Sequence, residues 1–250
     1  MKIVATIEAR MNSTRLPGKV LLDIGGIRSL ECQIHRLKQS KLIDEIVLAT
    51  TLNSNDDVLE KFADEIGLRS YRGSEEDVLG RILGAVKSVQ GEIQVQTTGD
   101  CPLIDPFVVD QVIQHYLDFK CYFDFVSNEI ERTFPIGLDC RVFPVKILEK
   151  VDKLCDDPVH RAHGSTYIYL GPGKERFRSK NISAPPGVYS SKWRWTLDTK
   201  EDLAFIRKVM KNFRDSYSEF SSLRLAEWLK LHPTISEINS GVSQKKIEEG

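Results

Sequence analysis

The chain has 250 residues, of which 41% are hydrophobic and 28% are charged, and its formal net charge at pH 7 is −1. This composition is typical of a globular protein and too apolar for a disordered one. A chain of this length buries about 70% of the surface that its unfolded form exposes, so it can be stable without disulfides or a structural metal. Proteins that hold nucleic acid by its phosphates carry a basic excess, which is missing here. We therefore expect no nucleic-acid partner.

The cysteines are widely spaced, odd in number and without a C-x-x-C pair: Cys32, Cys101, Cys121, Cys140 and Cys155. This pattern predicts reduced, mostly buried thiols rather than a disulfide framework or a zinc site. The N-terminal apolar run meets Glu8 and Arg10 too soon for a secretory signal. No run approaches the ~18 apolar residues that a membrane-spanning helix needs. We therefore expect a cytoplasmic protein that does not bind membranes.

β-branched strands and amphipathic helices alternate through the first half of the chain. The sequence predicts strands at 2–7, 45–51, 68–71 and 92–98, and helices at 29–39, 55–66, 76–88 and 106–117. This alternation is typical of β-α-β units, in which a mostly parallel sheet carries helices on both faces. The predicted fold class is therefore α/β.

The rhythm changes after about residue 120. Further strands are predicted at 122–127, 138–143, 177–182 and 193–197, and further helices at 145–154, 159–169 and 199–213. The stretch from 236 onward is polar and charged, so we expect residues 236–250 to form a flexible tail. Residues 1–250 are interpreted as a single domain.

The loop at 9–19, directly after the first predicted strand, concentrates positive charge. In open α/β sheets ligands bind beyond the carboxyl ends of the strands. Arg10, Arg15 and Lys19, together with backbone N–H groups, could cradle a polyphosphate there. The loop is not a Walker loop, because one glycine precedes Lys19 and Val20 replaces the hydroxyl residue that would hold magnesium. A solvated basic loop is the alternative interpretation.

Two later strands each end in an aspartate. Asp100 follows the predicted strand at 92–98, and Asp198 follows the one at 193–197. Two carboxylates that face a basic loop suit a triphosphate with magnesium, which prefers oxygen ligands. Structural roles are the alternatives: Asp105 is interpreted as a helix cap, and Asp198 with Glu201 three residues on also fits a capping box.

Four segments carry a family resemblance: A-R-x-x-S-T-R-L-P-G-K at 9–19, T-G-D-C-P-L-I-D-P at 98–106, T-F-P-x-G-L-D at 133–139 and T-L-D-T-x-E-D-L at 196–203. Together they resemble the SpsF-like (spore coat polysaccharide) branch of the acylneuraminate cytidylyltransferase family, which also holds the CMP-KDO and CMP-sialate synthetases. The resemblance implies a Rossmann-like nucleotidyltransferase fold with a CTP site at the first segment. It also implies magnesium held by Asp100 and Asp198, and a homodimer.

The resemblance also implies residue roles. It assigns nucleotide binding to Ala9, Arg10, Ser13, Arg15, Lys19, Arg72, Ser74, Thr98 and Asp100. It assigns catalysis to Arg10, Lys19, Asp100 and Asp198. Residues of about 120–185 would form the acceptor and dimerisation subregion, with an acceptor site at Asn128, Thr133, Phe134, Pro135, Gly137, Asp139, Arg161 and His163. A helix N-cap stays open as the role of Ser74, and a hairpin turn as that of 133–139. The chain departs from the pattern at Gln96, where an arginine is expected, and at Ala162, where an acid is expected.

The implied reaction is the transfer of CMP from CTP to a sugar acid or related hydroxyl acceptor, with release of pyrophosphate, in surface-polysaccharide or glycan precursor synthesis. A glycosyltransferase on a similar sheet would normally carry a D-x-D metal motif, and the chain has none. Two alternatives stay open from the sequence. One is a non-catalytic nucleotide-binding sensor, and the other is a nucleotidyltransferase that acts on a non-sugar acceptor.

Overall fold

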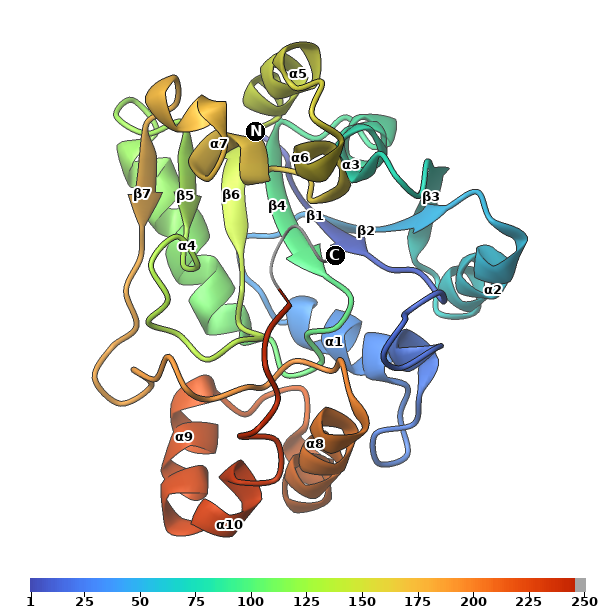
Figure 1. Cartoon of the computed structure of the whole chain (residues 1–250), viewed down its shortest axis with the longest axis vertical. Helices are drawn as coiled ribbons and strands as arrows, with labels where there is room; N and C mark the ends of the chain where they lie inside the picture. Colours follow the sequence, from blue (N-terminus) through green and yellow to red (C-terminus); the bar gives the residue numbers. More distant parts are fainter. Residues whose placement is uncertain (246–250) are drawn as a thin grey trace.

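The computed structural model of the protein describes residues 1–245, within which seven strands form one sheet (Figure 1). The strands follow the order β3-β2-β1-β4-β6-β5-β7 across the sheet. Their bounds are Ile3–Glu8 for β1, Glu45–Thr51 for β2, Arg69–Gly73 for β3, Ile93–Thr98 for β4, Phe125–Ser127 for β5, Arg141–Pro144 for β6 and Ser179–Asn181 for β7. The first four strands run parallel, whereas β6 pairs antiparallel with both β4 and β5. The predicted mostly parallel α/β sheet is confirmed.

Helices cover both faces of this sheet. Their bounds are Ser29–Leu37 for α1, Asp57–Glu65 for α2, Val78–Ser88 for α3, Pro106–Phe119 for α4, Val145–Leu154 for α5, Pro158–Ala162 for α6, Thr166–Tyr169 for α7, Lys200–Phe213 for α8, Ser222–Leu231 for α9 and Pro233–Ser236 for α10. Along β1, Ala5 and Ile7 belong to the core cluster shared with α1, α2 and α4. Val4, which precedes Ala5 and points to the opposite face, belongs to the cluster shared with α3, α5 and α7. This alternation follows from the two-residue period of a strand.

A third cluster lies outside the sheet. It joins α8 and α9 with apolar residues from other parts of the chain, among them Phe134, Leu138 and Trp195. Figure 1 shows these helices below the carboxyl ends of the parallel strands. The cluster therefore holds the C-terminal third of the chain against the end of the sheet where the loops leave β1 and β4.

The direction of strand addition reverses between β1 and β4. From β1 the chain moves outward through β2 and β3, and it then returns to place β4 on the other side of β1. Ligands bind beyond the carboxyl ends of the strands at such a reversal. Glu8 and Thr98, the last residues of the two strands, are paired in register, and the Gly99 amide donates to the Glu8 carbonyl at 2.8 Å. The loop at 9–19 and the segment that holds Asp100 therefore leave the sheet side by side.

The helix predicted at 159–169 is two short helices in the structure. The break falls at Gly164, whose φ of +63° is in the left-handed region that favours glycine. A Cβ at this position would come within 2.5 Å of the Gln96 side-chain amide nitrogen. The close approach of this turn to β4 therefore decides the break, and the helical spacing of apolar residues around it gives no sign of it.

The strand predicted at 193–197 is also absent. Among the described residues, the β-type pairing of this stretch is limited to an isolated bridge between Arg194 and Ile136. Trp195 is nevertheless 1% exposed, and Leu197 is fully buried. The alternation of apolar and polar residues here arises because alternate side chains of an unpaired segment are buried in the third cluster, not because the segment pairs in the sheet.

The end of the chain follows a defined path as far as residue 245. Neither α9 nor α10 is among the helices predicted from the sequence, and residues 236–250 were predicted to form a flexible tail. In the structure Asn239 is 3% exposed, and its side-chain amide donates to the Arg194 carbonyl at 2.9 Å. A buried, hydrogen-bonded residue is incompatible with fraying at that position. Residues 246–250 of the predicted tail lie outside the described residues.

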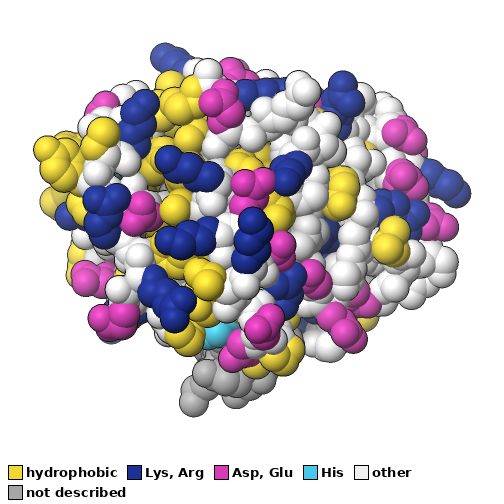
Figure 2. Space-filling model, turned by 90° about the horizontal axis from the view of Figure 1, so that it is seen from above, with side chains coloured by type: hydrophobic (Ala, Val, Ile, Leu, Met, Phe, Trp, Pro, Cys, Tyr) yellow, Lys and Arg dark blue, Asp and Glu magenta, His cyan; other side chains and the backbone are white. Residues whose placement is uncertain are grey.

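The surface carries charges of both signs. Figure 2 shows Lys and Arg side chains interspersed with Asp and Glu on the face seen from above, with hydrophobic side chains exposed between them. Of the cysteines, Cys121 is exposed and the other four are buried. Within residues 1–245, no helix combines the length and apolar character needed to cross a membrane.

Candidate active site

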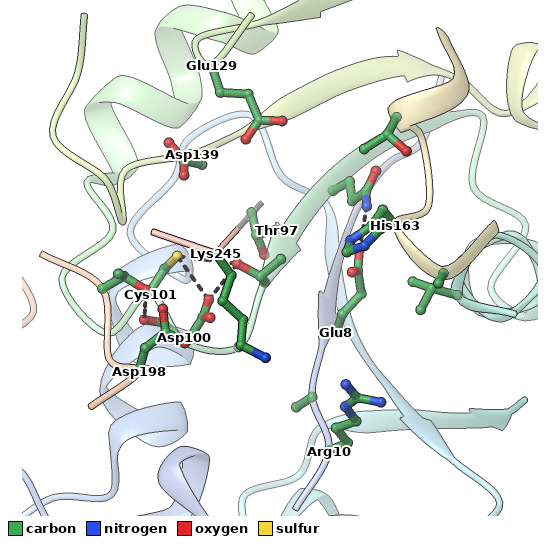
Figure 3. A pocket seen from close by; sticks show the side chains of 18 of the residues that line it. Glu8, Arg10, Thr97, Asp100, Cys101, Glu129, Asp139, His163, Asp198 and Lys245 are labelled. Carbon is green, nitrogen blue, oxygen red and sulfur yellow. Dashed lines mark hydrogen bonds between the residues drawn. The ribbon is translucent and has the colours of Figure 1, made fainter. Parts of the chain in front are cut away.

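A cavity of about 980 Å³ opens at the carboxyl ends of β1 and β4. Its walls come from the loop at 9–19, the segment 96–101, the residues around β6, the turn between α6 and α7, and the end of the described chain. Figure 3 shows Asp100, Asp198 and Cys101 gathered in one part of the cavity and Glu129 with Asp139 in another. The cavity therefore has two chemically distinct parts.

The loop at 9–19 is held in place by backbone contacts. The amides of Ser13 and Gly18 both donate to the Met11 carbonyl at 2.9 Å, and the Met11 amide donates to an Asp56 carboxylate oxygen at 2.6 Å. Gly18 adopts a φ of +68°, which a residue with a side chain rarely takes, and Lys19 follows immediately. The left-handed turn at Gly18 therefore sets the direction in which the Lys19 side chain leaves the loop.

Lys19 lies between two carboxylates. Its ammonium nitrogen is 2.9 Å from Asp100 Oδ2 and 2.6 Å from Asp198 Oδ1. Burial alone would lower the pKa of Lys19, but the two carboxylates outweigh it and the pKa is raised. For Asp100, burial alone would raise the pKa, but the Lys19 charge and the hydrogen bonds from Thr98, Lys19 and Cys101 together outweigh burial and lower the pKa to about 2. Lys19 and Asp100 therefore form a charged pair at neutral pH.

Asp198 is the centre of a larger ion-pair network. Its Oδ2 is 3.0 Å from an Arg15 guanidinium nitrogen and 2.5 Å from one of Arg194. Arg194 is 4% exposed and pairs in turn with Asp202 at 2.9 Å. The capping-box alternative for Asp198 is wrong by one position, because Thr199 is the N-cap of α8 and forms the box with Asp202. Asp198 is thus left to hold cations.

Asp100 is oriented by its own strand end. Its Oδ1 accepts a hydrogen bond from the Thr98 hydroxyl at 2.6 Å, so that Oδ2 is turned toward Lys19. Asp105, five residues on, caps α4 by accepting from the Phe107 amide at 2.9 Å. The two acids of this segment therefore divide as the sequence indicates: Asp105 is structural, and Asp100 faces the cavity.

The geometry fits a divalent cation. Asp100 and Asp198 converge on a single point that a cationic nitrogen occupies, which is the arrangement two carboxylate ligands of one metal ion require. No cluster of three or more His, Cys, Asp or Glu side chains with metal-binding geometry exists in the part of the chain described. Magnesium sites on nucleotides use one or two carboxylates and take the remaining ligands from phosphates and water. The donor set is therefore that of a metal bound together with a phosphorylated ligand.

The other part of the cavity is built from pairs of opposite charge. Glu129 pairs with Arg141 and accepts from the Tyr169 hydroxyl at 2.7 Å, and Asp139 pairs with Arg132. Burial alone would raise the pKa of Glu129, but the Arg141 charge and the hydrogen bonds from Arg141 and Tyr169 together outweigh burial and lower the pKa. For Asp139 burial prevails over Arg132, and the pKa is raised. This wall offers both donors and acceptors to a polar, hydroxylated molecule.

Gln96 connects this wall to the end of β1. Its side-chain amide donates to Glu8 Oε1 at 2.6 Å, and its carbonyl oxygen accepts from the Ser165 hydroxyl at 2.5 Å. Figure 3 shows Glu8 and His163 facing one another across the same region. Burial raises the pKa of Glu8 above its ordinary value. The glutamine that departs from the family pattern is thus a bridge between β1 and the turn that separates α6 from α7.

Most of the predicted nucleotide residues meet at the cavity. Those that line it are Ala9, Arg10, Ser13, Arg15, Lys19, Thr98, Asp100 and Asp198. Arg72 and Ser74 do not line it. The Arg72 guanidinium turns toward α2, 2.7 Å from Asp57, and donates to the Thr51 carbonyl at 2.8 Å. The Ser74 hydroxyl accepts from the Asp77 amide at 3.1 Å and shapes the turn before α3, whose N-cap is Asp77.

The predicted acceptor residues are mostly not at the cavity. Asp139 and His163 line it, whereas Asn128, Thr133, Phe134, Pro135, Gly137 and Arg161 do not. Phe134 is fully buried in the third core cluster, and the Asn128 amide donates to the Leu138 carbonyl at 2.8 Å. Arg161 ties α6 to Asp77 at 2.7 Å. Six of the eight predicted acceptor positions therefore lie away from the cavity, and their role in acceptor binding stays a prediction.

Several lining residues were missed from the sequence: Glu8, Arg81, Glu129, Arg132, Arg141, Tyr169, Gln244 and Lys245. A signal existed for Arg141, because it is a charged residue inside a predicted apolar strand. Glu8 likewise ends a run of apolar residues. Gln244 and Lys245 carried no signal, since they lie in the stretch expected to fray.

Comparison with known proteins settles the family. A family model described as cytidylyltransferase matches residues 4–134. The chain belongs to the cytidylyltransferase family. The spore coat polysaccharide biosynthesis protein SpsF of Bacillus subtilis is 33% identical over 83% of this chain and 85% of its own. The predicted SpsF-like family and nucleotidyltransferase class are thereby confirmed.

Two further relatives of this cytidylyltransferase match at least 98% of the chain. An uncharacterised protein of Methanocaldococcus jannaschii is 34% identical over 100% of this chain and 99% of its own. The solved structure of a cytidylyltransferase from Leptospira borgpetersenii superposes with a TM-score of 0.88 at 34% identity, covering 98% of this chain and 100% of that one. The family fold therefore extends beyond residue 134 to the C-terminal helices.

Proposed function

We propose that this cytidylyltransferase transfers CMP from CTP to a hydroxyl group of a sugar acid or related polar acceptor and releases pyrophosphate. The observation that carries the proposal is the convergence of Lys19, Asp100 and Asp198 at the reversal point between β1 and β4. Cations from one loop and two carboxylates from distant segments suit a triphosphate with its metal ion. The relationship to SpsF supports a role in surface-polysaccharide or glycan precursor synthesis.

The reaction is a single displacement. The acceptor oxygen forms a bond to the α-phosphorus of CTP, the bond from that phosphorus to the oxygen shared with the β-phosphate breaks, and pyrophosphate leaves. The hydroxyl proton is lost to water or a nearby base. Such phosphoryl chemistry depends mainly on positioning and on neutralising charge. When bound, magnesium supplies charge neutralisation on the phosphate oxygens.

The chain's own residues divide these tasks. Lys19, Arg15 and Arg10 bind the triphosphate and offset the negative charge that grows on the departing pyrophosphate. Asp100 and Asp198 hold the metal ion, and Thr98 keeps Asp100 oriented through the hydrogen bond of 2.6 Å. Asp139, His163 and the pairs around Glu129 bind the acceptor opposite. Because the nucleotide cations are already paired with carboxylates, binding exchanges one set of ion pairs for another.

Pyrophosphate release tests the proposal. Purified protein is incubated with CTP, Mg²⁺ and a panel of sugar acids, neutral sugars and non-sugar alcohols, and each reaction is repeated with ATP, GTP and UTP. We expect release from CTP that requires both Mg²⁺ and a sugar-acid acceptor. Tight CTP binding without release on any acceptor would instead identify a nucleotide sensor, and release with a non-sugar alcohol alone would contradict the acceptor class.

We also propose that the protein is a cytoplasmic homodimer. Large apolar side chains are exposed on residues 120–185, with Tyr122 at 66% and Leu170 at 50%. Figure 2 shows hydrophobic side chains at the left edge of that view, on the side of the sheet where Figure 1 has β5 and β7. Free cysteines are consistent with a reducing compartment. Light scattering on the purified chain should give twice the 28.4 kDa monomer mass, and a monomer mass at micromolar concentration would contradict the dimer.

A further inference from the structure

The segment 239–245 returns from α10 to the cavity. Asn239 fixes its start, because the buried side-chain amide donates to the Arg194 carbonyl at 2.9 Å and to Asp202 at 2.9 Å. Gln244 fixes its end through a hydrogen bond from the Arg194 guanidinium. Figure 1 shows this stretch turning back from α10 toward the sheet. Both fixed points involve the arginine that also pairs with Asp198.

Lys245 follows directly and extends into the cavity. Figure 3 shows its side chain among the other labelled residues that line the cavity. Its ammonium nitrogen is 3.4 Å from the Thr14 hydroxyl. Thr14 lies between Ser13 and Arg15 in the loop at 9–19, so Lys245 reaches the phosphate part of the cavity and not the wall around Glu129.

The ion-pair network around Asp198 contains equal numbers of positive and negative side chains. Lys19, Arg15 and Arg194 are the cations of the network. Asp100, Asp198 and Asp202 are its carboxylates, and they equal the cations in number. A network of equal opposite charges exerts little net attraction on a polyanion. The C-terminal segment brings a further ammonium group, that of Lys245, to the loop at 9–19, where we propose that the triphosphate binds.

We propose that Lys245 is a nucleotide-binding residue whose ammonium contacts the β- or γ-phosphate of bound CTP, and that residues 239–245 form a strap that holds it there. The nucleotide's identity rests on the proposed function, whereas the phosphate contact rests on the strap's own geometry. The contact is made to the part of CTP that leaves as pyrophosphate. CMP, which lacks the β- and γ-phosphates, does not engage Lys245.

Three ligands and three variants test this inference. Dissociation constants for CTP, CMP and inorganic tripolyphosphate are measured calorimetrically, with Mg²⁺, for wild type, Lys245→Ala, Lys245→Arg and the control Lys211→Ala. Lys211 is an exposed lysine on α8 that does not line the cavity. A charge-assisted contact at a partly exposed site is worth about five- to thirty-fold in affinity. We expect Lys245→Ala to lose this factor for CTP and tripolyphosphate and less than about twofold for CMP. Lys245→Arg and Lys211→Ala should stay close to wild type.

Each outcome decides the proposal. Unchanged CTP affinity in Lys245→Ala, or an equal loss for CTP and CMP, would overturn the phosphate contact. Wild type that binds tripolyphosphate through Lys245 but has no preference for CTP would contradict the proposed function and leave the strap standing. Wild type that binds none of the three ligands would overturn both. Matching melting temperatures of the variants exclude loss of fold as the cause of a change.

Discussion

The two parts of the cavity are assembled in different ways. In the part around Lys19, Asp100 and Asp198, which we propose binds the nucleotide, Lys19 pairs with residues 81 and 179 positions away in the chain. We call this the nucleotide part. In the part around Glu129 and Asp139, which we propose binds the acceptor and call the acceptor part, Arg132 and Arg141 pair with residues 7 and 12 positions away. The first part exists only because the sheet brings distant segments to one place, whereas the two arginine–carboxylate pairs of the second are made within one stretch around β6. Changes to the acceptor wall can therefore leave nucleotide binding intact, but the nucleotide part depends on the whole fold.

The largest effect should come from Asp100→Asn. The change keeps the shape and the hydrogen bond from Thr98 but removes the charge that holds Lys19 and the metal ion. We expect pyrophosphate release at saturating CTP and Mg²⁺ to fall about a thousandfold, which corresponds to ~4 kcal/mol of transition-state stabilisation. Asp118→Asn, at an exposed position on α4, serves as the control and should keep full activity. An Asp100→Asn enzyme with half the wild-type rate would rule out the ligand role.

Lys19→Ala tests whether the nucleotide part of the cavity binds CTP through the Lys19 ammonium. Removing the ammonium leaves Asp100 without its cation and Asp198 with only Arg15 and Arg194, so CTP must bind against additional negative charge. We expect CTP affinity measured by calorimetry to fall about 30- to 100-fold. Lys38→Ala, at an exposed position after α1, should change it less than about twofold. Unchanged nucleotide affinity in the Lys19 variant would contradict the triphosphate cradle.

Gln96→Ala tests the acceptor part separately. The variant removes the bridge between Glu8 and Ser165, so the turn at Gly164 loses its contact with β4. We expect the KM for the acceptor to rise about tenfold while CTP affinity changes less than about twofold. Steady-state kinetics with each substrate varied in turn makes the measurement. Equal effects on both substrates would show that the two parts are not independent.

The smallest effect should be a pH dependence of stability that belongs to Glu8. Burial raises the pKa of Glu8, so between its ordinary and its raised pKa the folded protein binds more protons than the unfolded chain. Stability therefore falls as pH rises through that window. Glu8→Gln keeps an acceptor for Gln96 without the charge, and it should melt a few degrees higher than wild type at pH 7.5 but not at pH 4. Glu131→Gln, at an exposed position, should show no such difference.

The sequence predicted that Lys19, Asp100 and Asp198 meet at one place, because the signals for this meeting are local. Asp100 and Asp198 each follow an apolar segment and Lys19 lies in the loop after the first strand, and the rules for parallel sheets place such segments at one edge. The acceptor part was predicted poorly because its residues are chosen by packing. Phe134 belongs to the predicted turn at 133–139 and Asn128 precedes this turn, but both side chains are buried, and no spacing in the sequence reveals which way a turn faces. The ordered path of residues 239–245 was not predicted, because the composition of this stretch is polar and nothing in it indicates that Asn239 is buried.

A crystal structure of the protein with CTP and Mn²⁺ tests the central claim most directly, since the anomalous signal of manganese locates the metal without ambiguity. The account predicts the metal between Asp100 and Asp198, in contact with the phosphates, and the triphosphate along the loop at 9–19 with Lys19 beside it. A triphosphate bound away from that loop, or a metal ion that neither aspartate contacts, would contradict it.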